Sequence, residues 1–588
     1  MARAARGGPR RALLDAGPRW AQRRRRRAAH EPHRPAARGL RGDEAALPLH
    51  LLRLRRRVAR DRLRRSARRP RGGARVIAQG AELRAPVARR THTLVVGSGA
   101  GGAVVAHALA TAGVETVVAE EGGWFRARDM SQRDDEMLPA LYRGRAQQLT
   151  RDGMINVLQG SCFGGSTVIN SADCEPTPEP VYEHWRRHHG LALDAAELRE
   201  SQARVESMLG VVPIDATQVN RNNGLLLEGA RRLGWKTQVF AHNRAGCTGS
   251  GYCLIGCAYD AKQGAHLNYL PRAVEAGADV YTDVRIERVV PRGGGGFLAS
   301  GAVVSRGARS ARLPFEVQAE RAVLAAGAVH SPAILDASGV GRGLPALGRN
   351  VSLQPQMSVA ALFPESVDVV AWRGIPQSAY CTEFDDHTAE HGLGGFRFEG
   401  ISGGMSQVAS GLGGFGAAHK ETMARARHGA LALLLVPDAP SGSLRWTRGE
   451  RGFAPRIDYR MREEWVARLR RGLRAAAQAY FAAGAREVRF GSEVFEPLRG
   501  EAELDRALAF PIRTGVTHFL SAHVQGSCRM GADPRGSVVD LDHQVHGVPG
   551  LYVVDASVFP TSASAHTMIP VMTFADRAVR RMLARSAG

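Results

Sequence analysis

A glycine-rich turn is the first place in this 588-residue chain where residue types and spacing specify chemistry. The apolar residues 93–96 lead into Gly97-x-Gly99-x-x-Gly102, and a helix-like segment then continues to Ala110. In such a strand–turn–helix unit the first glycine permits the tight turn, the second lets a pyrophosphate approach the backbone, and the third lets the helix pack against the strand. The helix N-terminus attracts the phosphate charge. The segment therefore predicts a dinucleotide-binding site.

Two further features extend this predicted site. The apolar residues 116–119 end in Glu120, 23 residues after Gly97, where a carboxylate can accept hydrogen bonds from an adenosine ribose. A second glycine-rich turn runs from Gly160 to Asn170 and enters another apolar segment. Two such turns in one chain indicate one long cofactor. An ordinary glycine-rich turn is the alternative, but it does not explain a strand, turn, helix, strand and acid in this order.

The elements that must position these residues come from widely separated parts of the chain. Residues 278–284 and 321–327 are strand-like, and Pro332 opens a helix at its favoured N-terminal position. Residues 550–555 form a further apolar strand that closes on an acid and precedes another helix. The nucleotide-binding domain is thus expected to be discontinuous.

The middle of the chain has a different character. Residues 345–510 contain a strand-like run at 430–436 and an amphipathic helix at 464–483. Together the segments predict an α/β fold, in which a Rossmann-like domain is joined to a second, α+β domain built on an antiparallel sheet.

The net charge of +24 belongs to the first part of the chain. Residues 1–90 contain 28 Arg and 6 acidic residues, so only about +2 is left for the rest. We expect this leader to be a disordered arm, or the product of a start that was predicted too far upstream. One alternative is a basic amphipathic helix near residues 47–63 that contacts acidic lipid, and the other is nucleic-acid binding. No apolar run is long enough for a signal peptide or a membrane span. We therefore expect neither a nucleic-acid partner nor membrane association.

Cysteine usage bears on the compartment. The chain has seven cysteines, an odd number, and no signal peptide. This pattern argues against a disulfide framework and favours a reducing compartment. We expect a cytoplasmic protein.

Four blocks of the chain resemble the glucose–methanol–choline (GMC) family of flavoproteins, which oxidise alcohols. The first is the glycine fingerprint with Glu120, and the second is Gly164-Gly165-Ser166-Thr167 with Asn170. The third is Gly327-Ala328-x-x-Ser331-Pro332-x-Ile334-Leu335-x-x-Ser338-Gly339-Val340-Gly341. The fourth comprises His523-x-x-Gly526-Ser527-Cys528-Arg529-Met530-Gly531, Asp555-Ala556-Ser557-x-x-Pro560-Thr561 and His566. The resemblance covers residues 91–588, and it is closest to bacterial GMC dehydrogenases and to the long-chain alcohol oxidase and sterol oxidase branches.

The resemblance implies a domain arrangement and an activity. Residues 91–344 and 511–588 would form the FAD-binding domain, and residues 345–510 the substrate-binding domain. The protein would be an FAD-dependent oxidoreductase acting on the CH–OH group of an aliphatic, sterol-like or sugar alcohol. Its partners would be this small molecule and an external electron acceptor, which is oxygen, a quinone or a cytochrome.

The resemblance also assigns two catalytic histidines. His523 would be the base that removes the hydroxyl proton, a task that suits an imidazole with a pKa near neutrality, while hydride passes to the flavin N5. His566 would hold the substrate oxygen. Position alone favours a structural histidine at 523, and the family match reverses that interpretation.

Contacts to FAD follow from the same resemblance. Because residues 160–170 contain no histidine that could tether the flavin, we expect noncovalent FAD, and we expect no metal at the catalytic site. The residues implied to bind FAD are Gly97, Gly99, Gly102, Glu120, Gly160, Gly165, Ser166, Asn170, Val284, Asp555, Ala556, Thr567 and Met568.

A cysteine motif departs from the rest of the pattern. Cys247, Cys253 and Cys257 resemble the spacing by which some GMC-type sugar dehydrogenases hold a three-iron cluster. A glycine loop with buried thiols is the alternative interpretation.

Three other functions compete with alcohol oxidation. A nicotinamide-dependent Rossmann dehydrogenase would use the first fingerprint, but it does not explain the second turn or the histidine pair. A flavin-containing lyase is also compatible with the motifs. A non-enzymatic adaptor built on the basic arm does not explain almost 500 nearly neutral residues.

Overall fold

The computed structural model describes residues 77–304, 313–387, 393–411, 415–449, 452–564 and 566–587. The basic helix considered near residues 47–63 lies outside these ranges. Strand β1 (Ile77–Gln79) and the first residues of β2 (Val87–Val96) fall inside the range 1–90 that was assigned to the leader. That boundary needs correction, because β1 pairs in parallel with β9 (Asp279–Thr282) and so belongs to the folded domain.

Eight strands of the described residues form the first sheet, in the order β1-β9-β3-β2-β12-β11-β10, with β23 paired to β12. The strands β1, β9, β3, β2, β12 and β23 pair in parallel, whereas β10 and β11 are antiparallel. This arrangement is the predicted Rossmann-like sheet, and the C-terminal strand β23 confirms that its domain is discontinuous. The bounds not yet given are β3 (Thr116–Ala119), β10 (Val284–Pro291), β11 (Phe297–Val303), β12 (Pro314–Leu324) and β23 (Leu551–Val553).

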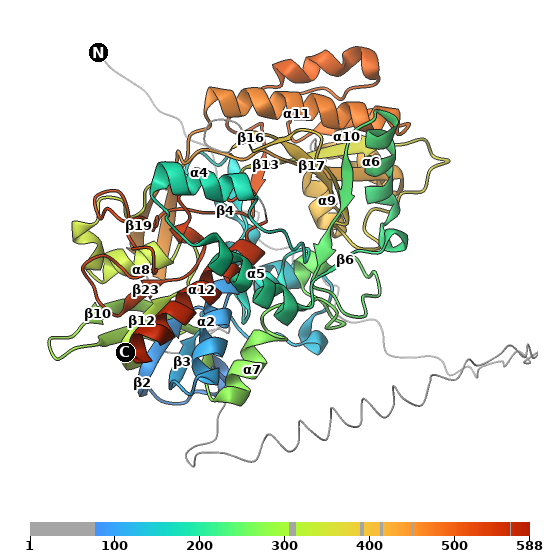
Figure 1. Ribbon diagram of the computed structural model, residues 1–588. Helices are drawn as coiled ribbons and strands as arrows, with labels where there is room; N and C mark the ends of the chain where they lie inside the picture. The colour runs from blue at the N-terminus through green and yellow to red at the C-terminus, as the bar shows by residue number, and fades with distance from the viewer. Residues whose placement is uncertain are drawn as a thin grey trace, which may run out of the picture. The chain divides into compact units, whose positions relative to one another are not determined.

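Alternate residues of β2 enter separate cores on the two faces of this sheet. Leu94 and Val96 join one core and Val95 joins the other, as expected for a parallel strand covered on both faces. Helix α2 (Ala100–Thr111) packs against α7 (Tyr269–Ala276) and α12 (Met568–Ala587), and α12 also packs against α5 (Ala195–Leu209). Figure 1 shows these helices together beside β2 and β3, so the two ends of the folded chain meet next to the first glycine turn.

Nine strands of the described residues form the second sheet, in the order β4-β5-β22-β13-β18-β17-β14-β7, with β21 paired to β13. Every pair is antiparallel except β5 with β22, which confirms the predicted antiparallel sheet. Four of these strands, β4, β5, β7 and β22, lie outside residues 345–510. The bounds are β4 (Gln148–Leu149), β5 (Ile155–Val157), β7 (Thr237–Val239), β13 (Gln356–Leu362), β14 (Ala379–Cys381), β17 (Arg397–Gly400), β18 (Gly429–Leu435), β21 (Glu487–Phe490) and β22 (Phe519–Ser521).

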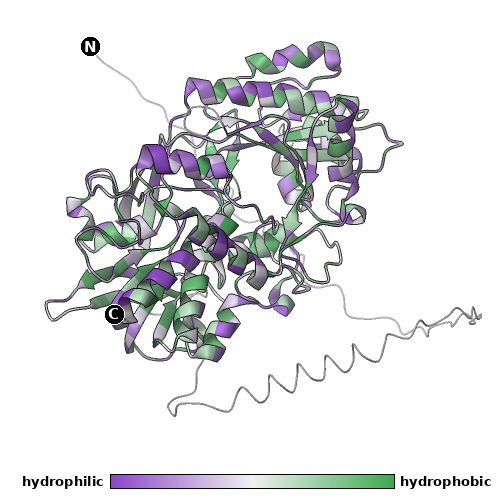
Figure 2. Ribbon diagram, viewed as in Figure 1, coloured by the Kyte–Doolittle hydropathy of each residue, from purple (hydrophilic) through white to green (hydrophobic). Residues whose placement is uncertain are grey.

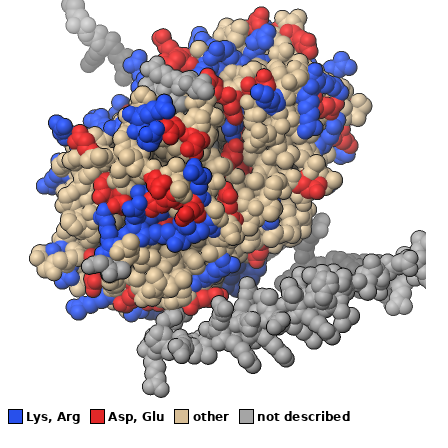
Figure 3. All heavy atoms as spheres, viewed as in Figure 1, with Lys and Arg blue, Asp and Glu red and all other residues tan. Residues whose placement is uncertain are grey.

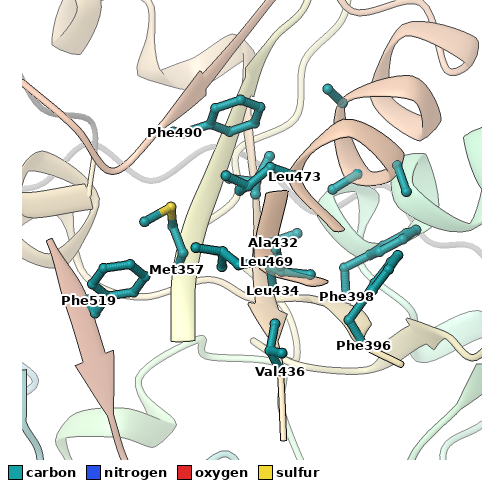
Figure 4. Packing of buried hydrophobic residues seen from close by; sticks show 14 of the residues in the cluster. Met357, Phe396, Phe398, Ala432, Leu434, Val436, Leu469, Leu473, Phe490 and Phe519 are labelled. Atoms are coloured by element: carbon teal, nitrogen blue, oxygen red, sulfur yellow. The ribbon is translucent and has the colours of Figure 1, made fainter. Parts of the chain in front are cut away.

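Helices cover one face of the second sheet. Helix α11 (Glu463–Ala482), predicted at 464–483, packs on β13 and β18 and beside α6 (Arg221–Arg232). Leu469 and Leu473 of α11 meet Leu434 of β18 in this core (Figure 4). Hydrophilic residues lie along the outer side of α11 and along α4 (Glu179–His189), as Figure 2 shows.

The remaining elements are short. The helices are α3 (Asp134–Leu141), α8 (Ser331–Ala337), α9 (Met405–Gly411) and α10 (Gly416–Ala424), and the strands are β6 (Val212–Pro213), β8 (Ala241–His242), β15 (Asp385–Asp386), β16 (Gly394–Gly395), β19 (Ser443–Gly449) and β20 (Gly452–Asp458). Within the described ranges, no helix is both long and apolar enough to cross a bilayer. Basic and acidic side chains are interspersed over the face shown in Figure 3.

Candidate active site

Residues of both sheets line a cavity of about 750 Å³. Its wall includes the turns that follow β2 and β12 in the first sheet, and residues of β13 and β18 in the second. With the exception of Gly102, every residue that the sequence assigned to catalysis or to FAD lines it. These are Gly97, Gly99, Glu120, Gly160, Gly165, Ser166, Asn170, Val284, His523, Asp555, Ala556, His566, Thr567 and Met568.

The first glycine turn presents an open helix end to this cavity. Gly97 has φ +100°, and a Cβ there would lie 2.3 Å from the carbonyl oxygen of Ala325. Gly102 lies behind the turn, where a Cβ would be 1.9 Å from the Gly97 oxygen, so its role is the predicted close packing. Gly99 caps α2 without a side-chain hydrogen bond, so the first N–H groups of this helix have no capping acceptor. The helix dipole and these N–H groups make the end an anion site.

The second glycine turn touches the first. A Cβ on Gly165, which has φ +55°, would lie 2.8 Å from Cα of Gly99. Gly164 N donates a hydrogen bond of 3.0 Å to Ser98 Oγ, and Gly160 N donates one of 2.9 Å to Ser166 Oγ. Two turns more than 60 residues apart therefore form one backbone-lined cradle.

Glu120 is bound to the first glycine turn and also lines the cavity. Its carboxylate accepts hydrogen bonds from Ser98 N at 2.9 Å, Ser98 Oγ at 2.7 Å and Gly122 N at 2.7 Å. Burial raises the pKa of Glu120, although these three donors oppose the shift. Val284 N donates to the Glu120 backbone oxygen at 2.8 Å, which places Val284 beside the acid.

A charged group at this end was missed by the sequence analysis. The Glu121 carboxylate contacts Arg143 Nη2 at 2.8 Å and Arg285 Nη2 at 2.7 Å, and all three residues line the cavity. Burial would raise the pKa of Glu121, but the two arginines outweigh it and hold the pKa well below its ordinary value. The only signal in the sequence was a second acid directly after Glu120.

The two predicted catalytic histidines lie against each other. His523 follows β22, His566 precedes α12, and their ring centroids are 5.0 Å apart with an interplanar angle of 83°. His523 Nδ1 lies 2.9 Å from Gln354 Oε1 and 3.2 Å from Gln356 Nε2. When Nδ1–H donates to the Gln354 oxygen, Nε2 of His523 is left as the nitrogen that can accept a proton.

The surroundings of the two histidines shift their pKa values in opposite directions. Burial lowers the pKa of His523 well below its ordinary value, and the charges of His566 and Arg397 lower it further. Burial would also lower the pKa of His566, but the charges of Glu399, Asp173 and Glu175 outweigh it and raise the pKa to about 10. At neutral pH these shifts favour a neutral His523 and a protonated His566.

A buried ionic network, also missed by the sequence analysis, surrounds His566. Glu399 of β17 has no exposed side-chain surface, and its Oε2 lies 3.1 Å from His566 Nε2. Arg397, two residues earlier on the same strand, contacts Glu175 at 2.7 Å and Asp385 at 2.7 Å. Arg397 and Glu399 share strand β17, but Glu175, Asp385 and His566 come from other segments, so the fold brings the group together.

This network resembles a metal site in one respect. Ligand atoms of Glu175, Glu399 and His566 lie within 4.8 Å of one another. However, Arg397 Nη1 lies 2.7 Å from one Glu175 oxygen and 2.8 Å from the other, so the cation that this carboxylate holds is a guanidinium.

The three motif cysteines lie away from the cavity lining. Cys253 is buried, and Cys247 and Cys257 are half-buried. Arg244 Nη1 lies 3.0 Å from Cys253 Sγ and 3.9 Å from Cys247 Sγ. The arrangement gives no support to the iron–sulfur cluster, which stays a prediction.

Comparison with known proteins decides the family. Residues 91–356 match the N-terminal part of the GMC oxidoreductase family, and residues 438–575 match its C-terminal part. The chain belongs to the GMC oxidoreductase family. Members of this family are enzymes, so the alternative of a non-enzymatic basic-arm adaptor is wrong.

Individual GMC relatives agree with this assignment. An uncharacterised GMC-type oxidoreductase of Mycobacterium tuberculosis is 35% identical over 506 residues, covering 86% of this chain and 77% of the relative. A long-chain-alcohol oxidase of Arabidopsis thaliana is 27% identical, covering 83% of this chain and 66% of the relative.

Solved structures share the GMC fold. Pyridoxine 4-oxidase from Mesorbium loti has a TM-score of 0.63 at 19% identity, covering 84% of this chain and 99% of the other. A formate oxidase of Aspergillus oryzae, studied for modification of its FAD, has a TM-score of 0.64 at 14% identity, covering 85% of this chain and 99% of the other.

Proposed function

We propose that this GMC oxidoreductase uses noncovalent FAD to oxidise the CH–OH group of an apolar alcohol, with His523 as the base. The observation that carries the proposal is the histidine pair. A neutral His523 and a cationic His566 line the same cavity as the two glycine turns. Proton acceptance and stabilisation of a negative oxygen are the two tasks that removal of a hydroxyl proton requires.

The residues of the cavity fit FAD. The open N-terminus of α2 suits a pyrophosphate, and the approach of Gly165 to Gly99 leaves no room for a side chain at position 165. Glu120, beside Val284, suits the adenosine ribose. Asp555 and Ala556 would face the ribityl chain, and Thr567 and Met568 the pyrimidine end of the ring. When bound, the flavin supplies the acceptor for the two electrons of the oxidation.

The histidines divide the proton chemistry between them. His523 Nε2 takes the hydroxyl proton, and negative charge then develops on the substrate oxygen. The His566 imidazolium holds that oxygen and stabilises the charge. Because His523 is buried and the His566 side chain is only 13% exposed, this interaction is stronger than it would be in water. Gln354 holds the His523 ring in place through Nδ1.

Apolar side chains in the cavity wall favour an apolar substrate over a sugar. Leu431 and Leu433 of β18 lie in the wall with Ile401 and Val408. An aliphatic or sterol-like alcohol would bury its carbon skeleton there, which is favourable in proportion to the apolar area covered. The similarity to a long-chain-alcohol oxidase supports this class.

Two measurements test the proposal. Acid precipitation of purified yellow protein should release FAD into the supernatant, and colour retained in the pellet would contradict noncovalent binding. Anaerobic mixing with a panel of primary alcohols of increasing chain length, a sterol and a sugar should bleach the flavin fastest with the apolar alcohols. A flavin that no alcohol reduces would overturn the proposed activity. Repeating the panel with oxygen, a quinone or a cytochrome would identify the acceptor.

A further inference from the structure

A second, small cavity adjoins His566. Its volume is about 10 Å³, close to the space needed by a single water molecule. Glu175, Asp385, Arg397 and Glu399 contribute charged groups to its wall. Among the described residues, only His566 lines both this cavity and the large one.

Two polar atoms in the wall of the small cavity need a partner. His387 Nδ1 and Ser564 Oγ are buried and have no hydrogen-bond partner within the described part of the chain. Buried polar atoms in proteins are hydrogen-bonded in the great majority of cases, commonly to an internal water. A cavity of this size with two such atoms and several charged groups in its wall is therefore a site for an ordered water.

The groups around this site form a path towards the surface. His566 Nε2 lies 3.1 Å from Glu399 Oε2 and 3.8 Å from Glu175 Oε2. Arg397, which contacts Glu175, also contacts Asp385, whose Oδ2 is 2.7 Å from the guanidinium. The exposed fraction of the carboxylate side chains increases along the path, from 0% for Glu399 to 13% for Glu175 and 17% for Asp385.

We propose that the small cavity is a proton route, in which a bound water together with Glu399, Glu175, Asp385 and His387 carries protons between His566 and solvent. The inference rests on the proposed alcohol oxidation, in which the histidine pair gains one proton from each hydroxyl group. His566 then gives its Nε2 proton to Glu399, and His523 passes the hydroxyl proton to His566, whose ring lies against its own. Glu399 passes its proton through the bound water, which His387 helps to hold, to Glu175, and Asp385 passes it outwards. One proton enters the pair, one proton leaves, and no electrons move along the route.

The position of the histidines explains why a separate route is needed. His523 is only 6% exposed, and an alcohol bound in the large cavity covers it further. Within the described ranges, the small cavity shares only His566 with the lining of the large one, so a substrate that fills the large cavity leaves the small one open. Other charged groups face His566 without lining the small cavity, namely Asp173 and, beyond it, His242 and Arg244.

The test separates proton release from oxidation. A single anaerobic turnover of the holoenzyme in weak buffer is followed by flavin absorbance and by a pH-indicator dye at the same time. In the wild type, the proton should appear in step with flavin reduction. In Glu175→Gln and Asp385→Asn, we expect proton release to lag behind reduction by at least about tenfold, because an amide cannot relay as a carboxylate does.

Matched variants control for charge and folding. Asp386→Asn removes the same charge one residue away from the route, outside the wall of the small cavity, and should show no lag. Glu175→Asp should restore the relay if Glu175→Gln folds poorly. Proton release in step with reduction in both amide variants would overturn the route.

A crystal structure gives an independent readout. It should show a water bonded to Ser564 Oγ and His387 Nδ1, and a dry cavity would also overturn the inference. If no alcohol reduces the flavin, the proposed function fails, whereas normal reduction with unchanged proton release counts against the route alone.

Discussion

Nε2 of His566 lies 3.1 Å from Oε2 of Glu399, a carboxylate that the fold shields completely from solvent. Desolvating two charges is costly, and replacing such a pair by apolar residues is often neutral or stabilising in proteins. The pair is therefore better explained by chemistry than by stability. The pair keeps a positive charge on His566, beside His523. Burial keeps the His523 ring neutral.

Glu399→Gln should lower the pKa of His566. The amide removes the nearest negative charge, whereas burial, which favours the neutral ring, remains. If the imidazolium is needed, flavin reduction should lose rate as pH rises through the His566 pKa, which is about 10 in the wild type, and at lower pH in the variant. Anaerobic stopped-flow reduction across pH measures this limb. Glu399→Asp keeps the charge and should stay close to wild type, and an unmoved limb in Glu399→Gln would contradict the assignment.

Folding stability should fall in mild acid. Burial lowers the pKa of His266 to about 3, of His330 to about 3 and of His543 to about 4, and it also lowers that of His523. These histidines bind fewer protons in the folded chain than in the unfolded chain below the ordinary histidine pKa of 6.5, so their contribution to stability decreases as pH drops below that value. The buried Asp438, whose pKa is raised to about 6, partly offsets this loss. The raised pKa of His566 acts oppositely: its stabilisation is complete below pH 6.5 and is lost as pH rises through about 10. Thermal unfolding as a function of pH should thus show losses at both ends, and a midpoint that is constant from neutral to mildly acidic pH would argue against buried neutral histidines.

Gly165→Ala should prevent FAD binding. The new Cβ would lie 2.8 Å from Gly99 Cα, so the two turns would have to separate where the phosphates approach. Gly190→Ala is a matched control, because Gly190 also has a positive φ, +65°, but a Cβ there meets nothing within 4 Å. Both variants carry a backbone strain of about 1 kcal/mol, and only the first should lose flavin absorbance after purification. Flavin retained at the wild-type level in Gly165→Ala would show that the cradle does not hold the cofactor.

Truncation should distinguish the leader from the first strand. Deleting residues 1–76 should leave flavin content and turnover nearly unchanged, because the cavity lining begins at Val96. Deleting residues 1–86 also removes β1 and uncovers the edge of β9, where Val280 is fully buried, so the thermal midpoint should fall. Equal midpoints for the two truncations would mean that β1 contributes nothing to the sheet, and loss of active protein on the shorter deletion would assign the leader a role in the fold.

The difference between what the sequence predicts and what it misses follows from distance along the chain. The glycine turn, Glu120 and the strand before Asp555 have local patterns that only one arrangement explains, and Gly97, Glu120 and Asp555 all line the cavity. Glu399 and Arg397 lie in a short strand with no distinctive pattern, and their partners His566 and Glu175 come from distant segments. The second sheet likewise takes β7 from far upstream, which no periodicity within 345–510 could reveal.

His523→Ala should slow flavin reduction by about 10²–10⁴-fold, the usual cost of removing a positioned acid–base group. FAD should remain bound, because the glycine cradle and Glu120 are unaffected by the change. His566→Asn should be milder, since an amide can still donate to the substrate oxygen, although it cannot carry the positive charge. Anaerobic stopped-flow reduction by the best alcohol of the panel gives both rates, with bound FAD measured in the same samples. A His523→Ala protein that reduces its flavin as fast as wild type across pH would require the base to be sought elsewhere in the cavity.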